Sequence, residues 1–574
     1  MRILGIGIVN HDDSFCLIEN NQIKNHFQFE RYIRIKKSDY SLYGAVDYTK
    51  FNILKNEIEN FIKSIKNIDY YVMAISNKSF EEKSFIYEKA LNCNIDLSFK
   101  EHTPKNLDDY IKLTPNLYYV DHHIAHACYA FHSSPFKESD ILAYDGNGFR
   151  YQSIFVNNKK QIFDLGCNSK NPDFMIGFLW SWFSNLFFNS KYHEGKMMGI
   201  SAHGTVNKKL LNLLYDIANI WKNKFLTLNK ITFDSNVQST KINLNRKLLE
   251  ILNLKNLNEL RSEENFKTVM ATLQYFSMEY TLENLQKHRT SDNLCISGGC
   301  ALNGYINEEI LKRKIYKKIH VPPAASDEGL SIGAALSLSF NFENKRTVIQ
   351  NSKELMYLGE NYIVKKDDNS EYMEDDELIP FIAKKISEGY VIGWYQGRSE
   401  SGPRALGNRS ILADPRNKNM KDYLNFKIKN REWYRPFAPS ILEDEVTKWF
   451  ITNGDKKSHF MTRILKYKKG KDAKVPAVTH IDKTARVQTV TEEINPRYYK
   501  LIKEFFKLTN VPILLNTSFN GKNEPIVETP SNAFKCFQKN NIDILVLENN
   551  VYFRNGDKDI KPFIEESNVD GNDR

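Results

Sequence analysis

Short apolar runs separated by polar turns dominate the first part of the chain. Residues 1–18 hold two apolar runs on either side of the polar stretch 10–13, which predicts two strands joined by a tight turn. Apolar residues at helical spacing in 51–65 predict a helix. The apolar run 141–144 ends at Asp145, just before two glycines. This pattern predicts a strand whose end can place a carboxylate in a cleft.

Four later stretches extend the pattern of alternating helices and strands. Residues 151–170 alternate as further sheet, and the aromatic-rich run 175–188 predicts a helix, which we interpret as core rather than as the lining of a substrate pocket. Residues 293–307 predict a strand, a glycine turn and the start of a helix, and 321–339 predict a helix rich in glycine and alanine. Together these elements indicate an α/β domain.

A polar segment from about 341 to 376 precedes a second α/β pattern. In this second pattern a helix is predicted in 378–389, and strands are predicted in 391–397 and 511–516. We therefore expect two large domains. The predicted organisation is a first domain at 1–345, a linker at 346–376, a second domain at 377–556 and a polar tail at 557–574.

Composition narrows the class of protein. A chain of 574 residues is too long for one core, and 41% hydrophobic with 26% charged residues is ordinary for a globular protein. No apolar run reaches the ~20 residues of a membrane helix, and the first residues show no secretory signal. The seven cysteines are scattered and include no CxxC pair, which indicates a reducing compartment and no zinc ribbon. We expect a cytoplasmic protein without a membrane partner.

Two histidines and two aspartates form a candidate metal site. His122 and His126 lie four positions apart in a segment that can be helical, so their rings can project from one face at a spacing that a divalent metal can bridge. Asp145 adds a carboxylate from a predicted strand end, and Asp327 could complete the shell from the start of the helix in 321–339. The alternative is a helix with several histidines on a solvated face.

Glycine-rich turns in the first domain are candidates for phosphate binding. The turn 297–299 follows a predicted strand and precedes a helix, so its backbone N–H groups can approach an anion. Lys196 lies in a second glycine-rich turn. His11 and Asp12 occupy the polar turn near the N-terminus, where a ligand commonly binds in actin-like ATP folds. Such a turn can also use its polar residues for turn geometry alone.

Fixed positive charge concentrates in the second domain, beside glycine, proline and aromatic residues rather than on polar helix faces. This setting favours an anionic ligand over ordinary surface charge. The formal net charge of +10 is only weak evidence for an anionic partner. The sequence has no compact block of lysine and arginine, so a nucleic-acid-binding surface is the less favoured interpretation. The basic positions are Arg404, Lys429, Arg431, Arg435 and Arg486.

An ordered series of motifs runs from about residue 3 to 555. The motifs are VDHHIAHACYAF, YDGNG, EGKMMGIS, SGGCALN, PPAASDEG, SGPRALGNRSILADPRN, REWYRPFAPSIL, TARVQTV and NTSFNGKNEPIVETP. In this order they resemble the O-carbamoyltransferase family that includes NodU, CmcH and TobZ. The resemblance implies an actin-like ATPase domain of the duplicated ribonuclease-H-like class at the N-terminus, similar to TsaD, and a YrdC-like α/β domain at the C-terminus.

The resemblance also implies an activity. In such enzymes the C-terminal domain converts carbamoyl phosphate and ATP into carbamoyl adenylate and pyrophosphate. The N-terminal domain then passes the carbamoyl group to an acceptor hydroxyl, and AMP leaves. We therefore expect an ATP-dependent O-carbamoyltransferase with iron(II) (Fe²⁺) or another divalent metal in the first domain and Mg²⁺ with ATP. The expected acceptor is a sugar, a secondary metabolite or a hydroxymethylated nucleobase. Nucleic acid is therefore expected as a partner only in the role of acceptor. A homodimer is also one of the expected states of the protein.

Carried over position by position, the resemblance implies four groups of site residues. The catalytic turn is matched by His11 and Asp12. The metal ligands are matched by His122, His126, Asp145 and Asp327. The nucleotide site of the first domain is matched by Lys196, Ser297, Gly298, Gly299 and Asn303. The carbamoyl phosphate and ATP site is matched by Arg404, Lys429, Arg431, Arg435, Arg486, Asn516 and Ser518.

Two other functions stay open at this point. The first is an enzyme of the tRNA threonylcarbamoylation type, which the C-terminal motifs disfavour because they are those of the small-molecule family. The second is a nucleotide-binding regulator without catalysis. Retention of His11, of all four predicted metal ligands and of the arginines argues against a regulator.

Overall fold

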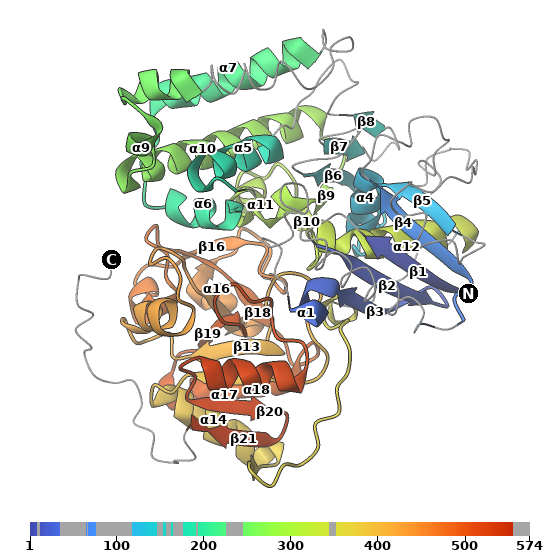
Figure 1. Ribbon diagram of the computed structural model, residues 1–574, viewed down its shortest axis with the longest axis vertical. Helices are drawn as coiled ribbons and strands as arrows, with labels where there is room; N and C mark the ends of the chain where they lie inside the picture. Colours follow the sequence, from blue (N-terminus) through green and yellow to red (C-terminus); the bar gives the residue numbers. More distant parts are fainter. Residues whose placement is uncertain are drawn as a thin grey trace. The chain divides into compact units, whose positions relative to one another are not determined.

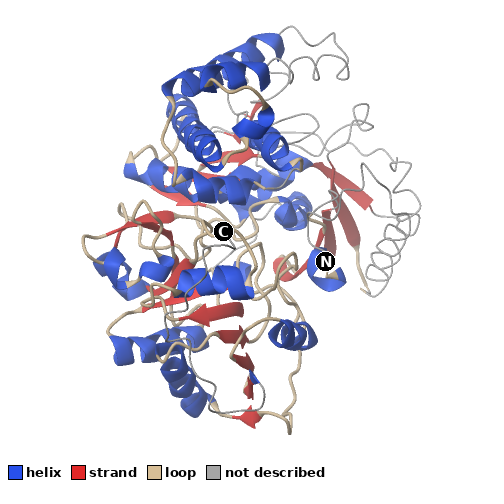
Figure 2. Cartoon of the chain, turned by 60° about the vertical axis from the view of Figure 1, so that its left-hand side comes forward, coloured by secondary structure: helices blue, strands red, loops and turns tan. Residues whose placement is uncertain are grey.

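The structure is a computed structural model that describes residues 1–7, 12–34, 65, 67–75, 117–145, 153–156, 162–164, 176–190, 193–225, 245–343 and 352–554. The chain divides into two compact units, Met1–Gln350 (unit 1) and Asn351–Arg574 (unit 2). Each unit combines helices with sheet, as Figure 1 shows along the chain and Figure 2 shows by element type. Both units are therefore α/β, as the sequence predicts.

The first sheet of unit 1 has the strand order β3-β2-β1-β4-β5. Its strands are β1 (Arg2–Gly7), β2 (Ser14–Glu19), β3 (Gln22–Gln28), β4 (Tyr70–Ile75) and β5 (Leu117–Asp121). Strands β1, β2 and β3 form an antiparallel meander, whereas β4 runs parallel to β1 and β5 runs parallel to β4. The pairing of β1 with β2 confirms the two strands predicted in residues 1–18.

The second sheet of unit 1 repeats this topology, with the order β10-β9-β6-β7-β8. Its strands are β6 (Asp140–Tyr144), β7 (Ser153–Val156), β8 (Ile162–Asp164), β9 (Asn293–Ser297) and β10 (Lys318–His320). Again the first three strands form an antiparallel meander, and the last two join in parallel beside the first. Two sheets of equal order and direction are a duplicated ribonuclease-H-like fold, the arrangement of actin-like ATPases, so the predicted fold class is confirmed.

Helices α4 and α12 pack against each other and connect the two sheets. Helix α4 (His122–His132) contacts β6 and β9, and helix α12 (Leu330–Glu343) contacts β1, β2 and β4. A side chain at Gly333 of α12 would collide with the carbonyl oxygen of Ala125 in α4. The missing side chain therefore lets the two helix backbones approach closely and places α4 beside the ends of β6 and β9.

The remaining described helices of unit 1 include the aromatic run predicted as core. Helix α5 covers this run and buries Trp180, Trp182 and Phe183, which confirms the core interpretation. In Figure 1, α7 and α10 lie side by side at the top of the view, and they are in contact. The bounds are α1 (Phe29–Ile33), α5 (Ile176–Phe188), α6 (Glu194–Ser201), α7 (Lys208–Phe225), α9 (Leu257–Leu260), α10 (Glu263–His288), η4 (Gly299–Leu302), α11 (Gly304–Lys312) and η5 (Asp327–Gly329).

Unit 2 is built on an eight-stranded mixed sheet with the order β11-β21-β20-β12-β13-β19-β14-β18. Its strands are β11 (Glu371–Tyr372), β12 (Ile392–Tyr395), β13 (Arg409–Ala413), β14 (Ala438–Leu442), β18 (Gln488–Val490), β19 (Ile513–Ser518), β20 (Ile544–Leu547) and β21 (Asn550–Phe553). A smaller sheet has the order β15-β16-β17, with β15 (Phe450–Ile451), β16 (Ile464–Tyr467) and β17 (Thr484–Arg486).

Helices of unit 2 cover this sheet and complete one continuous apolar core. Helices α14 and α17 pack together, and α18 packs on β12 and β20. Trp394 and Tyr395 of β12 are fully buried. The helices are α13 (Lys353–Met356), α14 (Asp375–Ser387), α15 (Met420–Tyr423), η6 (Leu424–Ile428), η7 (Glu443–Glu445), α16 (Val446–Trp449), η8 (Asp472–Lys474), η9 (Pro476–Val478), α17 (Pro496–Thr509) and α18 (Pro530–Lys539).

Most of the predicted elements coincide with described ones. The segment expected to be a linker contains α13 and β11, and β11 pairs with β21 in the large sheet. The helix predicted in 51–65 and the tail at 557–574 lie outside the described residues. Among the helices that the structure describes, none has the length and apolar composition needed to cross a bilayer. The exact domain boundaries stay a prediction.

The buried carboxyl group of Asp543 is expected to weaken unit 2 at neutral and alkaline pH. Burial raises the pKa of Asp543 to about 6, although its Oδ2 accepts a hydrogen bond of 2.7 Å from the backbone N–H of Val391. The Asp543 carboxyl has a higher pKa in the folded protein than in the unfolded protein, where its pKa is about 4. Its contribution to stability is therefore fully present below about pH 4 and is lost as the pH rises through its pKa in the folded protein.

The variant Asp543→Asn keeps the hydrogen-bond acceptor without the charge. It is expected to raise the free energy of unfolding by ~2 kcal/mol at about pH 8 and to change it little at about pH 4. Urea unfolding of both proteins at the two pH values measures the difference. An equal effect at both pH values would show that the ionised carboxylate is not the cause.

Candidate functional site

Helix α4 presents the two predicted histidine ligands from its first turns. It begins at His122, directly after β5, and the side chain of Asp121 caps it by accepting hydrogen bonds from the backbone N–H groups of His123 and Ile124 at 2.8 and 3.3 Å. A position and the fourth one after it share a helix face. The ring centroids of His122 and His126 accordingly lie 4.8 Å apart. Both histidines are buried, which rules out the solvated helix face.

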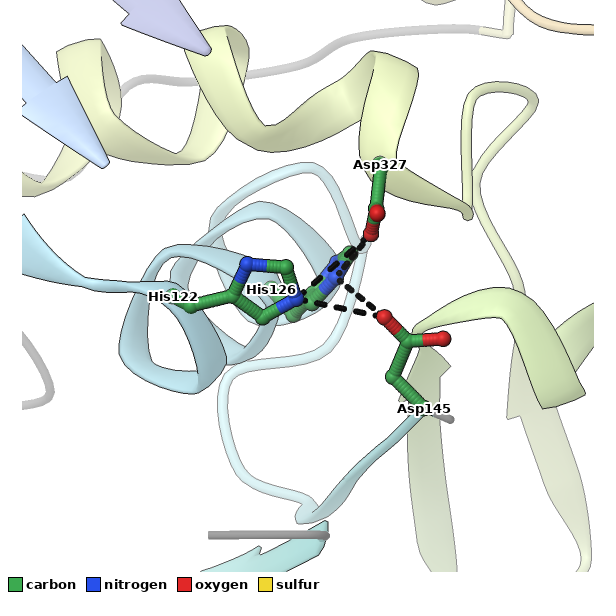
Figure 3. Close-up of side chains that lie close together, drawn as sticks. All are labelled: His122, His126, Asp145 and Asp327. Atoms are coloured by element: carbon green, nitrogen blue, oxygen red, sulfur yellow. Dashed lines mark hydrogen bonds and ion pairs between the residues drawn. The ribbon is translucent and has the colours of Figure 1, made fainter. Parts of the chain in front are cut away.

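Two aspartates complete this group from other elements. Asp145 follows the end of β6, and Asp327 begins η5 in the segment after β10. Figure 3 shows the four side chains pointing toward a common centre, with His122 and His126 on one side and the carboxylates opposite. The ligand atoms of these four residues, here called the quartet, all lie within 4.8 Å of one another.

Short contacts connect each imidazole of the quartet to both carboxylates. The Nε2 atom of His122 lies 3.2 Å from Asp145 Oδ2 and 3.5 Å from Asp327 Oδ1. The Nε2 atom of His126 lies 3.2 Å from Asp327 Oδ1 and 3.7 Å from Asp145 Oδ2. Two imidazole nitrogens and two carboxylate oxygens that converge in this way are a donor set for a divalent transition metal.

Electrostatics in the quartet favour a cation at its centre. Burial disfavours a charged imidazole, but the contacts with Asp145 and Asp327 outweigh burial and raise the pKa of His126 to about 9. Burial also disfavours a charged carboxylate, yet the contacts with His122 and His126 hold the pKa of the Asp145 carboxyl well below its usual range. Positive charge beside Asp145 therefore stabilises its carboxylate. A proton on His126 supplies it without a metal, and a divalent cation supplies it more strongly.

The residues predicted for a nucleotide lie around the quartet. Ser297 ends β9, and its Oγ lies 3.2 Å from Nδ1 of His126. The backbone N–H of Gly299 donates to Asp145 Oδ1 at 3.2 Å, and that of Gly298 donates to Ala325 O at 2.7 Å. The nucleotide-binding role of these residues stays a prediction.

Two other residues predicted for the first domain have structural contacts of their own. The side chain of Asn303 accepts from the backbone N–H of Ile306 at the start of α11 and exchanges hydrogen bonds with Gln274. The Nζ atom of Lys196 in α6 lies 5.4 Å from the ring centroid of Phe188. Asp12 is buried, whereas its neighbour His11 lies outside the described residues.

Four of the predicted arginines of unit 2 lie close together. Burial lowers the pKa of Arg486 well below its usual range, and repulsion from Arg404, Arg431 and Arg435 lowers it further. Burial and the nearby Arg435 likewise lower the pKa of Arg431 to about 9. These four residues are here called the arginine cluster, and its Arg435 forms an ion pair of 3.7 Å with Glu432. Such a cluster is suited to a ligand with several negative charges.

The strand end at β19 adds polar groups to unit 2. Asn516 donates to Ala405 O, Ser440 Oγ and Gln488 Oε1 at 3.0 to 3.1 Å. Its buried Oδ1 accepts no hydrogen bond from the residues that the structure describes, and the buried Nε of Arg486 likewise donates to none of them. Unused buried polar groups are costly unless a ligand or water satisfies them. Both groups therefore point to a polar ligand.

Lys429 has a different setting from the arginines. Its Nζ contacts the carbonyl and hydroxyl oxygens of Ser518, the carbonyl oxygen of Asn520 at 2.9 Å and Asn520 Oδ1 at 2.7 Å. Ser518 also donates its hydroxyl hydrogen bond to Asn520 Oδ1 at 2.7 Å. The lysine thus holds the segment that follows β19 in place through hydrogen bonds. Its predicted contact with carbamoyl phosphate or ATP stays a prediction.

Sequence reasoning missed two residues that organise the site in unit 2. Glu400 is buried, and its Oε1 accepts from the backbone N–H groups of Leu406, Asn408 and Arg409 at 2.8, 2.8 and 3.0 Å. The carboxylate thereby shapes the turn that carries Arg404. Neither the burial of Glu400 nor its backbone partners can be seen in the sequence, so no local signal could have found this role. Asn520 was likewise not singled out, although its side chain holds Lys429.

These features define an α/β enzyme class with a duplicated ribonuclease-H-like unit around a His₂Asp₂ centre and a second unit with an arginine cluster. Residues 2–336 match the family described as Carbamoyltransferase N-terminus. Residues 383–554 match the family described as Carbamoyltransferase C-terminus. The chain therefore belongs to the carbamoyltransferase family and is an enzyme of that family.

Relatives of known sequence agree with this membership. An uncharacterized protein of Synechocystis sp. is 31% identical and aligns over 96% of this chain and 96% of its own length. The nodulation protein NolNO of Sinorhizobium fredii is 30% identical over 94% of this chain and 78% of its own length. The 3'-hydroxymethylcephem-O-carbamoyltransferase of Amycolatopsis lactamdurans is 32% identical over 46% of this chain and 49% of its own length.

Proposed function

We propose that the chain is an ATP-dependent O-carbamoyltransferase that activates carbamoyl phosphate in unit 2 and transfers the carbamoyl group in unit 1. One observation carries the proposal: the two units hold separate sets of side chains with different chemistry. The quartet in unit 1 suits a divalent cation, whereas the arginine cluster in unit 2 suits an anion. An enzyme with two half-reactions needs two such sites.

The arginine cluster fits the activation step. Carbamoyl phosphate and the triphosphate of ATP are both polyanions, and bidentate guanidinium groups bind phosphate oxygens well. Water first cleaves carbamoyl phosphate to carbamate and phosphate. A carbamate oxygen then attacks the α-phosphorus of ATP, which forms carbamoyl adenylate and releases pyrophosphate. Mg²⁺ accompanies ATP, and the arginines stabilise the negative charge on the departing pyrophosphate.

The quartet fits the transfer step. His122, His126, Asp145 and Asp327 would hold a divalent metal, for which we propose iron(II), and the metal would supply a Lewis acid next to the carbamoyl oxygen. The acceptor hydroxyl oxygen attacks the carbamoyl carbon, and AMP leaves with the bridging oxygen. A base must remove the hydroxyl proton. We assign that role to His11. The next residue in the sequence, Asp12, is buried.

The class of acceptor follows from the same chemistry. One relative is named for a carbamoyl transfer to a hydroxymethyl group, which supports a hydroxyl acceptor for this chain as well. We propose a sugar or a secondary metabolite, with a hydroxymethylated nucleobase as a further candidate. An enzyme of the tRNA threonylcarbamoylation type is less well supported, because the family match extends through both carbamoyltransferase domains.

The first expected result is release of pyrophosphate that depends on both substrates. The purified chain with ATP, Mg²⁺ and carbamoyl phosphate should form pyrophosphate at least about a hundredfold faster than without carbamoyl phosphate, because adenylation needs the carbamate from carbamoyl phosphate as its nucleophile. A coupled pyrophosphate assay measures the rate. Release that is independent of carbamoyl phosphate would argue against the proposed activation step. Mass spectrometry of candidate acceptors for the gain of one carbamoyl group then identifies the second substrate.

A further inference from the structure

The turn after β9 reaches two of the four quartet residues. Ser297 contacts His126 through its side chain, and Gly299 contacts Asp145 through its backbone N–H. Ser297 lies opposite Ala143 in the parallel pairing of β9 with β6, so both strands end at the same edge of the sheet. The turn therefore begins next to the end of β6, which Asp145 directly follows.

The two contacts of the Ser297 hydroxyl show in which hydrogen bond it is the donor and in which it is the acceptor. Its Oγ lies 3.0 Å from the carbonyl oxygen of Ala325, which can only accept, so the hydroxyl proton points there. The same Oγ lies 3.2 Å from Nδ1 of His126 and must act as the acceptor in that contact. The imidazole therefore carries its proton on Nδ1. Its Nε2 lone pair is then directed at the centre of the quartet, as a metal ligand requires.

Burial leaves Ser297 few other roles. Its side chain has 0% exposure, and its proton and one lone pair are both engaged. The N–H groups of Gly298 and Gly299 are also engaged, with Ala325 and Asp145. A side chain at Gly298 would collide with the backbone of Tyr144, and its φ of 94° is a conformation that favours glycine. The turn is thus built for close contact with the end of β6 and with the segment that leads to Asp327.

We infer that Ser297 is a positioning residue of the metal centre, and that the turn 297–299 holds His126 and Asp145 in place for the cation. The inference rests on the proposed function, because it presumes that the quartet binds a metal. It differs from a phosphate-binding role, in which the turn would use the same polar groups for a nucleotide. The two roles predict different properties for a variant without the hydroxyl.

Cobalt(II) binding to the full chain tests the inference without any measurement of turnover. Cobalt(II) has absorption bands that respond to its ligands, and competition with a chromophoric chelator gives its affinity. The variant Ser297→Ala is expected to bind cobalt(II) about ten- to a hundredfold more weakly, with altered bands, because loss of a residue that orients a metal-binding histidine has effects of this size. Ser297→Thr, which keeps the hydroxyl, is expected to recover most of the affinity.

Ser337→Ala is the matched control. Ser337 is also a fully buried serine of unit 1, but its hydroxyl donates to Ala334 O within α12 and does not contact the quartet. It is expected to bind cobalt(II) as the unchanged protein does. If Ser297→Ala does not fold, Ser297→Gly also removes the hydroxyl without adding a metal ligand and is expected to show the same direction of change.

The outcomes separate the inference from the proposed function. Unchanged cobalt(II) affinity in a folded Ser297→Ala or Ser297→Gly protein would overturn the positioning role, and a loss of ATP affinity alone would assign the turn to a nucleotide instead. If the unchanged protein bound no cobalt(II), the proposal that the quartet binds a metal would itself be wrong. Weaker binding in Ser297→Ala with recovery in Ser297→Thr would support the inference.

Discussion

Replacement of His126 by alanine is expected to lower carbamoyl transfer at least about a thousandfold while pyrophosphate release continues near the rate of the unchanged enzyme. The Nε2 atom of His126 lies 3.2 and 3.7 Å from the two quartet carboxylates. Without it the centre loses one of its two nitrogen ligands. A Lewis acid stabilises developing charge by several kcal/mol, and about 4 kcal/mol corresponds to a thousandfold change in rate. The arginine cluster in unit 2 is unchanged in this variant.

Two assays on the same preparation measure this result. One follows pyrophosphate, and the other follows carbamoylated acceptor. His132→Ala is the matched control, because His132 is also buried in α4 but packs on Phe340, with ring centroids 5.0 Å apart, outside the quartet. The control removes a buried imidazole and is expected to keep the transfer rate per folded molecule. Equal losses of transfer and of pyrophosphate release in His126→Ala would contradict the assignment of separate half-reactions to the two units.

Replacement of Arg486 by alanine is expected to have the opposite selectivity. Pyrophosphate release should fall by about a hundred- to a thousandfold, because a buried guanidinium that binds an anion contributes roughly 3 to 4 kcal/mol to a transition state with developing negative charge. Arg486→Lys should recover only part of the rate, since lysine keeps the charge but not the planar pair of donors. Arg416→Ala is the control, because Arg416 is exposed, pairs with Asp414 and is not part of the cluster.

The same variant should be more stable than the unchanged protein in the absence of ligand. Burial and three neighbouring arginines lower the pKa of Arg486, so its charged form is disfavoured in the fold. Alanine removes this repulsion, and such a gain in stability with a loss of activity is common at binding sites. Thermal unfolding with and without ATP measures the effect. A ligand-free melting temperature that falls in Arg486→Ala would show that the arginine has a structural role instead.

Several site residues could be predicted from local sequence alone. The spacing of His122 and His126 placed both on one helix face, and the apolar run 141–144 predicted the strand that ends before Asp145. The strand, turn and helix in 293–307 were also predicted, and they are found as β9, η4 and α11. These predictions succeed because helical and strand periodicity are properties of neighbouring residues.

Other features of the site depend on contacts that sequence spacing does not contain. Ser297 and His126 are 171 positions apart, and Glu400 shapes its turn through backbone groups that carry no sequence signal. The arginine cluster combines segments around 404, 431 and 486, and only their packing reveals the low pKa of Arg486. Long-range hydrogen bonds and burial are set by how distant segments of the chain pack together, so they could not be derived from the order of residues.

The amino-acid sequence by itself determined the α/β character of both halves, the family resemblance and the membership of the quartet. Only the tertiary structure decided that His122, His126, Asp145 and Asp327 converge within 4.8 Å in a buried position, and that the turn 297–299 contacts two of them. The physical reason is that the start of α4, the ends of the parallel strands β6 and β9 and the start of η5 meet at one end of the sheet. Residues that are far apart in the chain thereby share one electrostatic environment.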